Sequence, residues 1–156
     1  MIDVAIPGFG RLALEHLVCD YNGTLARDGV LLDGVAARLT ALAAKLTVHV
    51  VTGDTFGTAL RSLQGMPCAV TLLPSEGQVQ AKQAFVTRLG AAGVVAVGNG
   101  RNDRLMLEAV ALGIAVVGDE GWAADTMQAC DIVVRHIADA LALLENPRRL
   151  IATLRA

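Results

Sequence analysis

The sequence predicts a doubly wound α/β fold, with a single, mostly parallel, Rossmann-like sheet covered by helices on both faces. Short β-branched apolar runs alternate with amphipathic helical runs along the chain, as successive βαβ units require. Hydrophobic residues make up 54% of the 156 residues and aromatic residues only 3%, so the core must be built from the aliphatic side chains typical of buried parallel strands. No repeat, linker or low-complexity tract interrupts the alternation. We therefore expect residues 1–156 to form one domain.

The chain begins with two extended pieces, at residues 3–6 and 12–19, joined by the turn Pro7-Gly8-Phe9-Gly10. Residues 8–13 match the G-x-G-x-x-A pattern of dinucleotide-binding folds. That pattern needs a full helix after it, whereas here the next apolar strand follows within a few residues. We interpret the segment as a hairpin turn.

The later elements follow from 3.6-residue or alternating apolar periodicity. A turn is expected over residues 26–30, and Asp33 has the residue type of an N-cap for the first helix. The pattern predicts helices over residues 33–45, 55–64, 79–89, 103–112, 121–128, 138–144 and 147–155. It predicts strands over residues 47–51, 68–73, 93–97, 114–117 and 132–134.

Charge and cysteine content narrow the range of partners and compartments. The formal net charge of −2 gives no reason to expect binding to nucleic acid or to an anionic membrane. Cys19, Cys68 and Cys130 are odd in number and lack metal-ligand spacing, which favours a reducing compartment. The chain shows neither a leader-like start nor an apolar run of about 18 residues. We expect a soluble, cytoplasmic protein, and its aliphatic composition is compatible with a homo-oligomer.

Asp20 is the leading candidate for a functional residue. The run Leu17-Val18-Cys19 ends in this single carboxylate, and the turn Tyr21-Asn22-Gly23-Thr24 follows at once. In an open α/β sheet, ligands bind at the carboxyl ends of the strands. A carboxylate placed there can act as a nucleophile or as a ligand for a hard cation. The structural alternative is a turn-initiating aspartate, because Asp-x-Asn-Gly is favourable turn chemistry.

Other polar side chains are expected at the same edge of the sheet. Thr52 follows one predicted strand, Asn99 and Asp103 follow another, and Lys82 lies on the helix before the latter. A nucleophilic carboxylate, a hydroxyl, an ammonium and a second acid are the groups that phosphoryl transfer through an aspartyl-phosphate requires. Singly, Thr52 could end a strand in a turn, Lys82 could be a solvated helix residue and Asp103 could cap a helix.

Together, these groups predict a division of roles in phosphoryl transfer. Asp20 attacks phosphorus, while Thr52 and the backbone amides of residues 22–24 hold the phosphoryl oxygens. Lys82 offsets their charge, and Mg²⁺ bridges Asp20 and the acidic loop at residues 99–103.

These segments resemble motifs I to IV of the haloacid dehalogenase (HAD) superfamily, in residues 20–25, 51–54, 82 and 98–103. The resemblance covers essentially the whole chain, and it is greatest to small soluble proteins akin to the phosphorylation domain of P-type ATPases. It implies a HAD-like hydrolase domain with Asp20 on the central strand. It further implies catalytic roles for Asp20, Asn22, Thr52 and Lys82, phosphate contacts from Asn22, Gly23, Thr24, Thr52, Gly53 and Lys82, and Mg²⁺ ligands in Asp20, the Asn22 carbonyl, Asn99 and Asp103.

Two residues depart from the pattern of typical phosphatases of this superfamily. Asn22 stands where they have a general acid, and an amide cannot give a proton to an alkoxide leaving group. Ordinary phosphate esters should therefore lose about 10²–10⁴-fold in rate. Asn99 stands where they have an acid, and it can ligate Mg²⁺ only as a neutral oxygen donor. We expect a Mg²⁺-dependent phosphohydrolase that is slow on esters and faster on acyl phosphates or anhydrides.

The spacing of the motifs leaves no room for a cap domain. About 30 residues separate Asp20 from Thr52, and about 30 separate Thr52 from Lys82, and one helix–strand unit fills each interval. The substrate is expected to be a small phosphorylated compound or a phosphoprotein.

Three alternatives stay open from the sequence. Asn22 and Asn99 also fit a catalytically impaired module that binds phosphate or Mg²⁺ for regulation. A phospho-receiver domain gathers similar groups, but it carries an acidic pair after its first strand, where this chain has the single Asp20. Dehalogenation or phosphonate cleavage is the third alternative, which the Gly-Thr turn after Asp20 disfavours.

Overall fold

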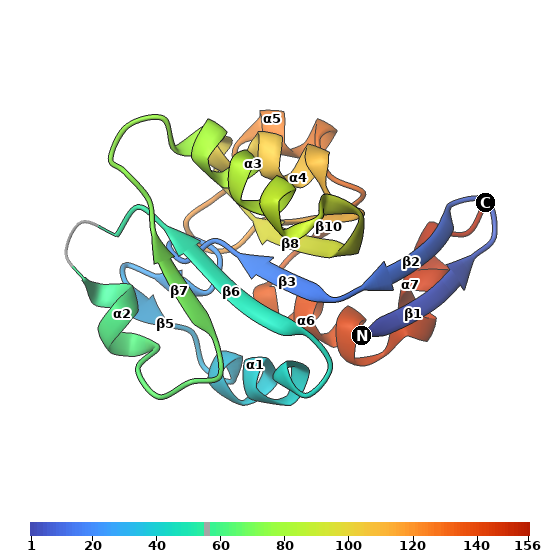
Figure 1. The fold of residues 1–156 in the computed structure, drawn as a ribbon, viewed down its shortest axis with the longest axis horizontal. Helices are drawn as coiled ribbons and strands as arrows, with labels where there is room; N and C mark the ends of the chain where they lie inside the picture. Colours follow the sequence, from blue (N-terminus) through green and yellow to red (C-terminus); the bar gives the residue numbers. More distant parts are fainter. Residues whose placement is uncertain (55–56) are drawn as a thin grey trace.

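The centre of the molecule is a six-stranded parallel sheet (Figure 1). The computed structural model describes residues 1–54 and 57–156. In sheet order the strands are β10 (Ile132–Val134), β9 (Leu112–Val116), β8 (Val94–Gly98), β3 (His16–Cys19), β6 (Thr47–Thr52) and β7 (Ala69–Leu72). The chain builds outward from β3 to β7 and then crosses back to β8 on the other side. This reversal creates a topological switch point at the carboxyl end of β3, where ligands bind in such sheets. The predicted fold class is confirmed.

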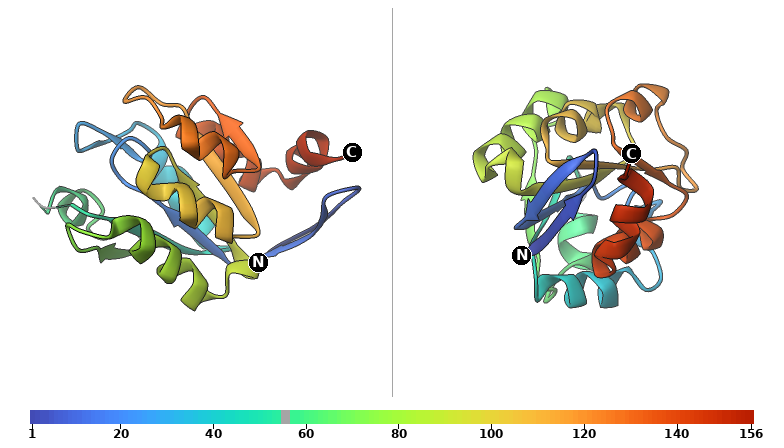
Figure 2. Two further views of the ribbon diagram at one scale, coloured as in Figure 1. Left: turned by 90° about the horizontal axis from the view of Figure 1, so that it is seen from above. Right: turned by 90° about the vertical axis from the view of Figure 1, so that its right-hand side faces the viewer.

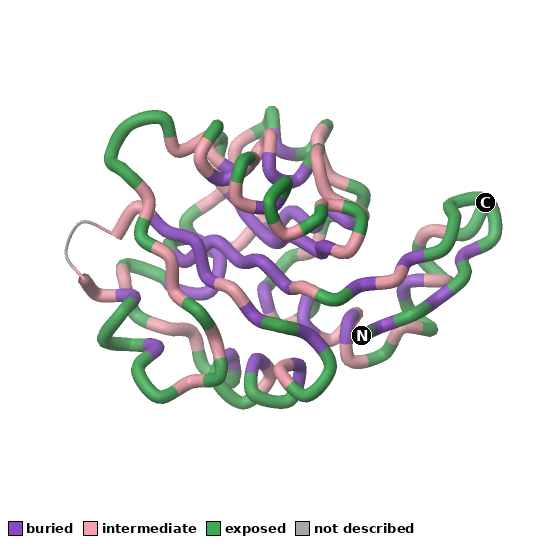
Figure 3. Tube along the Cα trace, in the orientation of Figure 1, coloured by how far each residue is buried: buried purple, intermediate pink, exposed green. Residues whose placement is uncertain are grey.

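Helices cover both faces of this sheet. Figure 1 shows α1 (Val35–Ala43) and α6 (Ile137–Glu145) on one face, and α3 (Gln78–Leu89), α4 (Arg104–Ala109) and α5 (Ala124–Gln128) on the other. Alternate residues of β3 enter two separate apolar clusters. Leu17 belongs to the cluster beneath α1 and α6, and Val18 to the cluster beneath α3 and α4. Burial on both faces gives the continuous purple path along the central strands in Figure 3.

The N-terminal hairpin and the C-terminal helix form a small unit beside the sheet. β1 (Ile2–Ile6) and β2 (Gly10–Leu14) pair antiparallel, and α7 (Pro147–Leu154) packs against β1. Figure 2 shows this unit projecting from the end of the sheet opposite to the loops that follow the strands. The hairpin turn is confirmed in place of a dinucleotide-binding loop. The strand predicted over residues 12–19 is interrupted at Glu15, where the chain leaves the hairpin and enters the sheet.

Several element boundaries differ from the predicted ones. The N-cap of α1 is Gly34, whose φ of 78° lies in the left-handed region, and no side chain caps this helix. The prediction of Asp33 as N-cap is therefore wrong. The helix predicted over 103–112 is shortened to α4, because the chain already enters β9 at Leu112. The helix predicted over 121–128 begins only at Ala124.

Short elements complete the described chain. α2 (Thr58–Ser62) is shorter than predicted, and the start predicted at Thr55 lies outside the described residues. β4 (Ala26–Arg27) and β5 (Val30–Leu31) form a small antiparallel hairpin where a turn was expected. The 3₁₀ turns are η1 (Ala91–Gly93) and η2 (Arg101–Asp103). Within the described residues no helix is both long and apolar enough to cross a membrane.

Candidate active site

Asp20 is the first residue after the central strand β3. Its N–H donates to the Val97 carbonyl at 3.0 Å, so the backbone pairing with β8 continues up to the carboxylate. The residue is 7% exposed. The apolar run before it is buried within the sheet, while the turn after it returns toward the surface at Asn22. The strand therefore holds a single carboxylate in a buried position at the switch point of the sheet.

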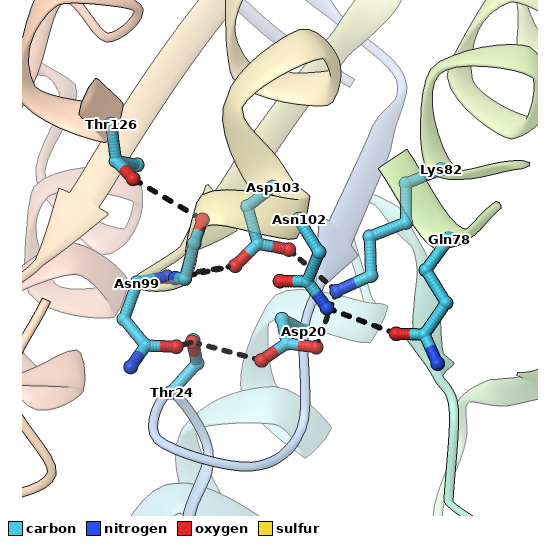
Figure 4. A network of polar contacts seen from close by, with 9 residues as sticks. Asp20, Thr24, Gln78, Lys82, Asn99, Asn102, Asp103 and Thr126 are labelled. Carbon is cyan, nitrogen blue, oxygen red and sulfur yellow. Dashed lines mark hydrogen bonds and ion pairs between the residues drawn. The ribbon is translucent and has the colours of Figure 1, made fainter. Parts of the chain in front are cut away.

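The Lys82 side chain joins Asp20 to a second buried carboxylate, Asp103 (Figure 4). Lys82 Nζ donates to Asp20 Oδ1 at 2.6 Å and to Asp103 Oδ1 at 2.5 Å. Lys82 and Asp103 are fully buried. The ammonium comes from α3, and the carboxylates come from the ends of β3 and of the loop after β8. Packing of α3 against α4 thus brings together charges that are far apart in the sequence.

Asp103 is held by the loop that contains it. Its Oδ2 atom accepts hydrogen bonds from the backbone N–H groups of Asn99 at 3.0 Å and Gly100 at 2.9 Å. Any Cβ at Gly98 would overlap the Asp103 carboxylate, so this close approach requires glycine there. Both oxygens of Asp103 accept hydrogen bonds within the protein.

Asp20 and Lys82 have strongly perturbed titration behaviour. Burial, together with the neighbouring Asp103 charge, raises the pKa of Asp20 to about 7 against the lowering effect of Lys82. Burial alone would lower the pKa of Lys82, but the two adjacent carboxylates outweigh it and raise that pKa. Two carboxylates therefore share one ammonium in a buried place, which leaves an excess of negative charge that favours a proton or another cation.

The Thr24 hydroxyl connects Asp20 to the motif IV loop. Thr24 Oγ1 lies 3.5 Å from Asp20 Oδ2 and 3.2 Å from Asn99 Oδ1. Asn99 Nδ2 donates to the Gly121 carbonyl at 3.0 Å, which orients its oxygen toward Thr24. Gly23, with a φ of 78°, makes room for this amide, because a Cβ on it would overlap the Asn99 side chain. The Asp20 and Asn99 oxygens thus lie within reach of one hydroxyl.

The other residues named from the sequence lie around this centre. Thr52 is buried at the end of β6, the strand next to β3, and Gly53 follows it. Asn22 is exposed in the loop after Asp20. Side-chain contacts thus join Asp20, Thr24, Lys82, Asn99 and Asp103, while the roles assigned to Asn22, Thr52 and the two glycines stay predictions.

Sequence analysis gave no site role to three polar residues of the network, although one of them, Asn102, lies within the segment 98–103. Asn102 Nδ2 donates to Gln78 Oε1 at 3.0 Å, and Thr126 Oγ1 donates to the Gly100 carbonyl at 3.2 Å (Figure 4). Gln78 could have been found, because it lies four residues before Lys82 and so on the same face of the helix. The sequence carries no signal for Thr126, since its place depends on how α5 packs against the loop.

The donor set fits a hard divalent cation. Asp20 Oδ2 lies at the long distance of 3.5 Å from Thr24 Oγ1, and the nearby Asn99 supplies a second side-chain oxygen. Oxygen donors beside an excess of negative charge are what Mg²⁺ binds. Among the described residues no group of three or more His, Cys, Asp or Glu side chains could hold a metal, so any cation here would rely on amide and backbone oxygens as well.

Solved structures with a similar fold cover most of the chain. One, assigned to subfamily III A of the HAD superfamily hydrolases, comes from Legionella pneumophila (TM-score 0.70, 18% identity, 91% of this chain and 87% of that one). Another is the 3-deoxy-D-manno-octulosonate 8-phosphate phosphatase of Moraxella catarrhalis, in complex with magnesium and phosphate ions and the KDO molecule (TM-score 0.71, 14% identity, 92% and 94%). The cobalt-bound deoxy-D-mannose-octulosonate 8-phosphate phosphatase of Haemophilus influenzae is similar to the same degree (TM-score 0.71, 13% identity, 92% and 94%).

One curated protein is related in sequence. The uncharacterized protein MJ0073 of Methanocaldococcus jannaschii is 53% identical over 62 residues, which are 40% of this chain and 67% of that protein. No protein-family model matches the chain.

Proposed function

We propose that this chain, which belongs to the same family as MJ0073 and has the fold of the HAD superfamily hydrolases, is a metal-dependent phosphohydrolase acting through an aspartyl-phosphate on Asp20. The observation that carries the proposal is the buried Asp20–Lys82–Asp103 arrangement at the switch point of the sheet. Structural ion pairs alone seldom place an unbalanced second carboxylate in such a position.

The proposed reaction has two balanced steps. First, an Asp20 carboxylate oxygen attacks phosphorus, the bond from phosphorus to the leaving oxygen breaks with its electron pair on the leaving group, and an aspartyl-phosphate forms. Water then attacks phosphorus, the bond to Asp20 breaks, and the proton of the water passes to solvent or to the released phosphate. Placement of the Asp20 carboxylate at the end of a rigid strand limits the directions from which it can attack, which favours the first displacement.

The surrounding residues would stabilise the phosphoryl group. Lys82 donates to one Asp20 oxygen and lies close enough to offset the charge of a phosphoryl group bound there. The hydroxyls of Thr24 and Thr52 and the backbone N–H groups of residues 22–24 would hold phosphoryl oxygens. Mg²⁺, held by Asp20, the Asn22 carbonyl and Asn99, would supply further positive charge when bound. Asp103 would hold Lys82 in place, and its role as a further Mg²⁺ ligand stays a prediction.

The substrate class follows from Asn22. Because this amide cannot protonate a leaving group, substrates whose leaving group departs as a stable anion should react fastest. Acyl phosphates and phosphoanhydrides fit this requirement, in small molecules or in phosphoproteins. The two phosphatases described above act on a sugar phosphate by name, so a sugar phosphate belongs among the substrates tested. A homo-oligomer and a cytoplasmic location stay predictions.

The second candidate function is a regulatory module that binds phosphate or a metal without turnover. The two amides, Asn22 and Asn99, favour it, because both stand at positions where an acid would speed the reaction or strengthen metal binding.

Phosphate release from a substrate panel distinguishes the two functions. The panel runs from acetyl phosphate to simple sugar phosphates, with and without Mg²⁺, and uses Asp20→Asn as the control. Turnover that needs both Mg²⁺ and Asp20, and that is fastest on acetyl phosphate, supports the enzyme. If no substrate of the panel releases phosphate while the protein still binds Mg²⁺ or phosphate, the regulatory module is supported.

A further inference from the structure

Gln78 lies where three parts of the candidate active site meet. It is the first residue of α3 and precedes Lys82 by one helical turn, so both side chains leave the same face of the helix. Figure 4 shows Lys82 extending from α3 toward Asp20 and Gln78 beside it, with the Gln78 carbonyl oxygen directed at the Asn102 amide. Gln78 is partly buried, whereas Gln80, two residues later on the same helix, is exposed.

Two contacts fix the Gln78 side-chain amide. Its Oε1 atom accepts a hydrogen bond from Asn102 Nδ2 at 3.0 Å. Its Nε2 atom lies against the backbone of Gly53, and any Cβ at position 53 would overlap it. Gly53 directly follows Thr52 at the end of β6, and Asn102 directly precedes Asp103. The amide therefore spans the opening between the two loops that flank Asp20.

The contacts leave the donor end of this amide available. The Gln78 carbonyl accepts from Asn102, whereas Nε2 donates to no acceptor among the described residues. An amide nitrogen carries two N–H donors, and partly buried donors need an acceptor to offset their desolvation. The Nε2 atom lies against Gly53, which directly follows Thr52, one of the residues predicted to hold phosphoryl oxygens. An oxygen-rich anion bound at Asp20 would supply the acceptor.

We propose that Gln78 is a substrate-contacting residue whose side-chain amide donates a hydrogen bond to an oxygen of the phosphoryl group at Asp20. Asn102 acts as a positioning residue that holds this amide in place. The inference rests on the proposed function, because it assigns the Gln78 ligand to the same phosphoryl site. Gln78 would thus supply a polar substrate contact from helix α3. The described residues form no cap domain that could supply one.

Binding of inorganic phosphate in the presence of Mg²⁺, measured by calorimetry on the full chain, tests the contact without requiring turnover. Gln78→Ala should weaken phosphate binding by about tenfold or more, as expected for a hydrogen bond to a charged group. Gln80→Ala, on the exposed face of the same helix, is the matched control and should bind as the wild type does. Gln78→Glu should bind more weakly than Gln78→Ala, because it replaces the donors with a negative charge.

Asn102→Ala distinguishes the proposed substrate contact of Gln78 from the positioning role of Asn102. It keeps the Gln78 donors but removes their tether, so its loss of phosphate affinity should be smaller than that of Gln78→Ala. The double variant should lose little more than Gln78→Ala alone. If Gln78 only held the loop through Asn102, Gln78→Glu, which keeps an acceptor for Asn102, would bind phosphate nearly as the wild type does. Gln78→Ala and Asn102→Ala would then have equally lowered melting temperatures.

The outcomes separate this inference from the proposed function. Equal affinities for wild type, Gln78→Ala and Gln80→Ala overturn the inference alone. A wild type that binds phosphate but releases none from the substrate panel overturns the enzyme and still tests the contact. A wild type that neither binds phosphate nor turns over any substrate overturns both.

Discussion

Asp20 and Asp103 are two buried carboxylates bonded to the same lysine, yet their surroundings differ. Asp103 has Lys82 on one oxygen and two backbone N–H groups on the other. Asp20 has Lys82 on one oxygen, a 3.5 Å contact from Thr24 on the other, and a hydrogen bond from the Tyr21 backbone. Hydrogen bonds to both oxygens hold the Asp103 side chain in place, whereas burial and the charge of Asp103 raise the pKa of Asp20 to about 7. Asp103 is thus suited to hold Lys82, and Asp20 to react.

The largest expected effect tests this division of roles directly. Asp20→Asn should lower turnover by at least about 1,000-fold, because the nucleophile is lost. The same change should raise the melting temperature of the metal-free protein at pH 8 by a few degrees, because it removes a buried charge that lacks full compensation. Asp103→Asn should lower the melting temperature instead. Equal losses of stability in the two variants would contradict the comparison.

Removing the shared ammonium should destabilise the fold. Lys82→Met leaves two carboxylates buried without their partner, a change of the kind that costs about 3–5 kcal/mol. The loss should be greater at pH 8 than at pH 5, since Asp20 can take up a proton at the lower pH. Urea unfolding at both pH values measures it. A loss independent of pH would mean that Asp20 does not carry the unbalanced charge.

Asn22→Asp tests whether the lack of a general acid at position 22 limits turnover by Asp20. Restoring an acid two residues after Asp20 should raise turnover on a sugar phosphate by about 100-fold and leave acetyl phosphate hydrolysis nearly unchanged. Steady-state rates on the two substrates give the ratio. A uniform change on both substrates, or none, would show that leaving-group protonation does not limit the wild type.

Gly23→Ala tests the contact between motif I and Asn99. Gly23 and Gly34 have the same φ of 78°, but only at Gly23 would a Cβ meet another side chain, that of Asn99. Gly23→Ala should therefore destabilise the protein by about 1–2 kcal/mol more than Gly34→Ala, which pays for the backbone conformation alone. Thermal unfolding of both variants measures the difference. Equal losses would show that Asn99 moves aside without cost.

The stability of the metal-free protein should also depend on pH through Asp20. Because the folded-state pKa of Asp20, about 7, lies above its ordinary value of 3.8, the native state binds more protons than the unfolded state between these two values. The contribution of Asp20 to the free energy of unfolding should therefore fall as pH rises from about 4 to about 7 and then level off. The difference between wild type and Asp20→Asn isolates this contribution. It should be seen without added metal, and a flat difference would contradict the raised pKa.

The sequence by itself determined the sheet and the chain positions of the site. Alternating apolar runs and helical periodicity are local signals, and parallel strands bring their carboxyl ends to one edge of the sheet. The helix bearing Lys82 is therefore present within one residue of its predicted bounds, and the strand before Asp20 ends where predicted, although it begins at His16 rather than at residue 12. Periodicity did not determine every element boundary. Helix α1, for example, is capped by Gly34 and not by the predicted Asp33.

Only the tertiary structure decided how these residues contact one another. Lys82 meets Asp20 across 62 residues of sequence, and Thr24 meets Asn99 across 75. Which carboxylate is fully hydrogen-bonded, and which is left with a raised pKa, depends on burial and on backbone N–H groups that no local pattern records. The same holds for Gln78, whose amide finds Asn102 only because α3 packs beside the loop before α4. Local sequence patterns determined the order of the site residues, and long-range packing determined their charges and partners.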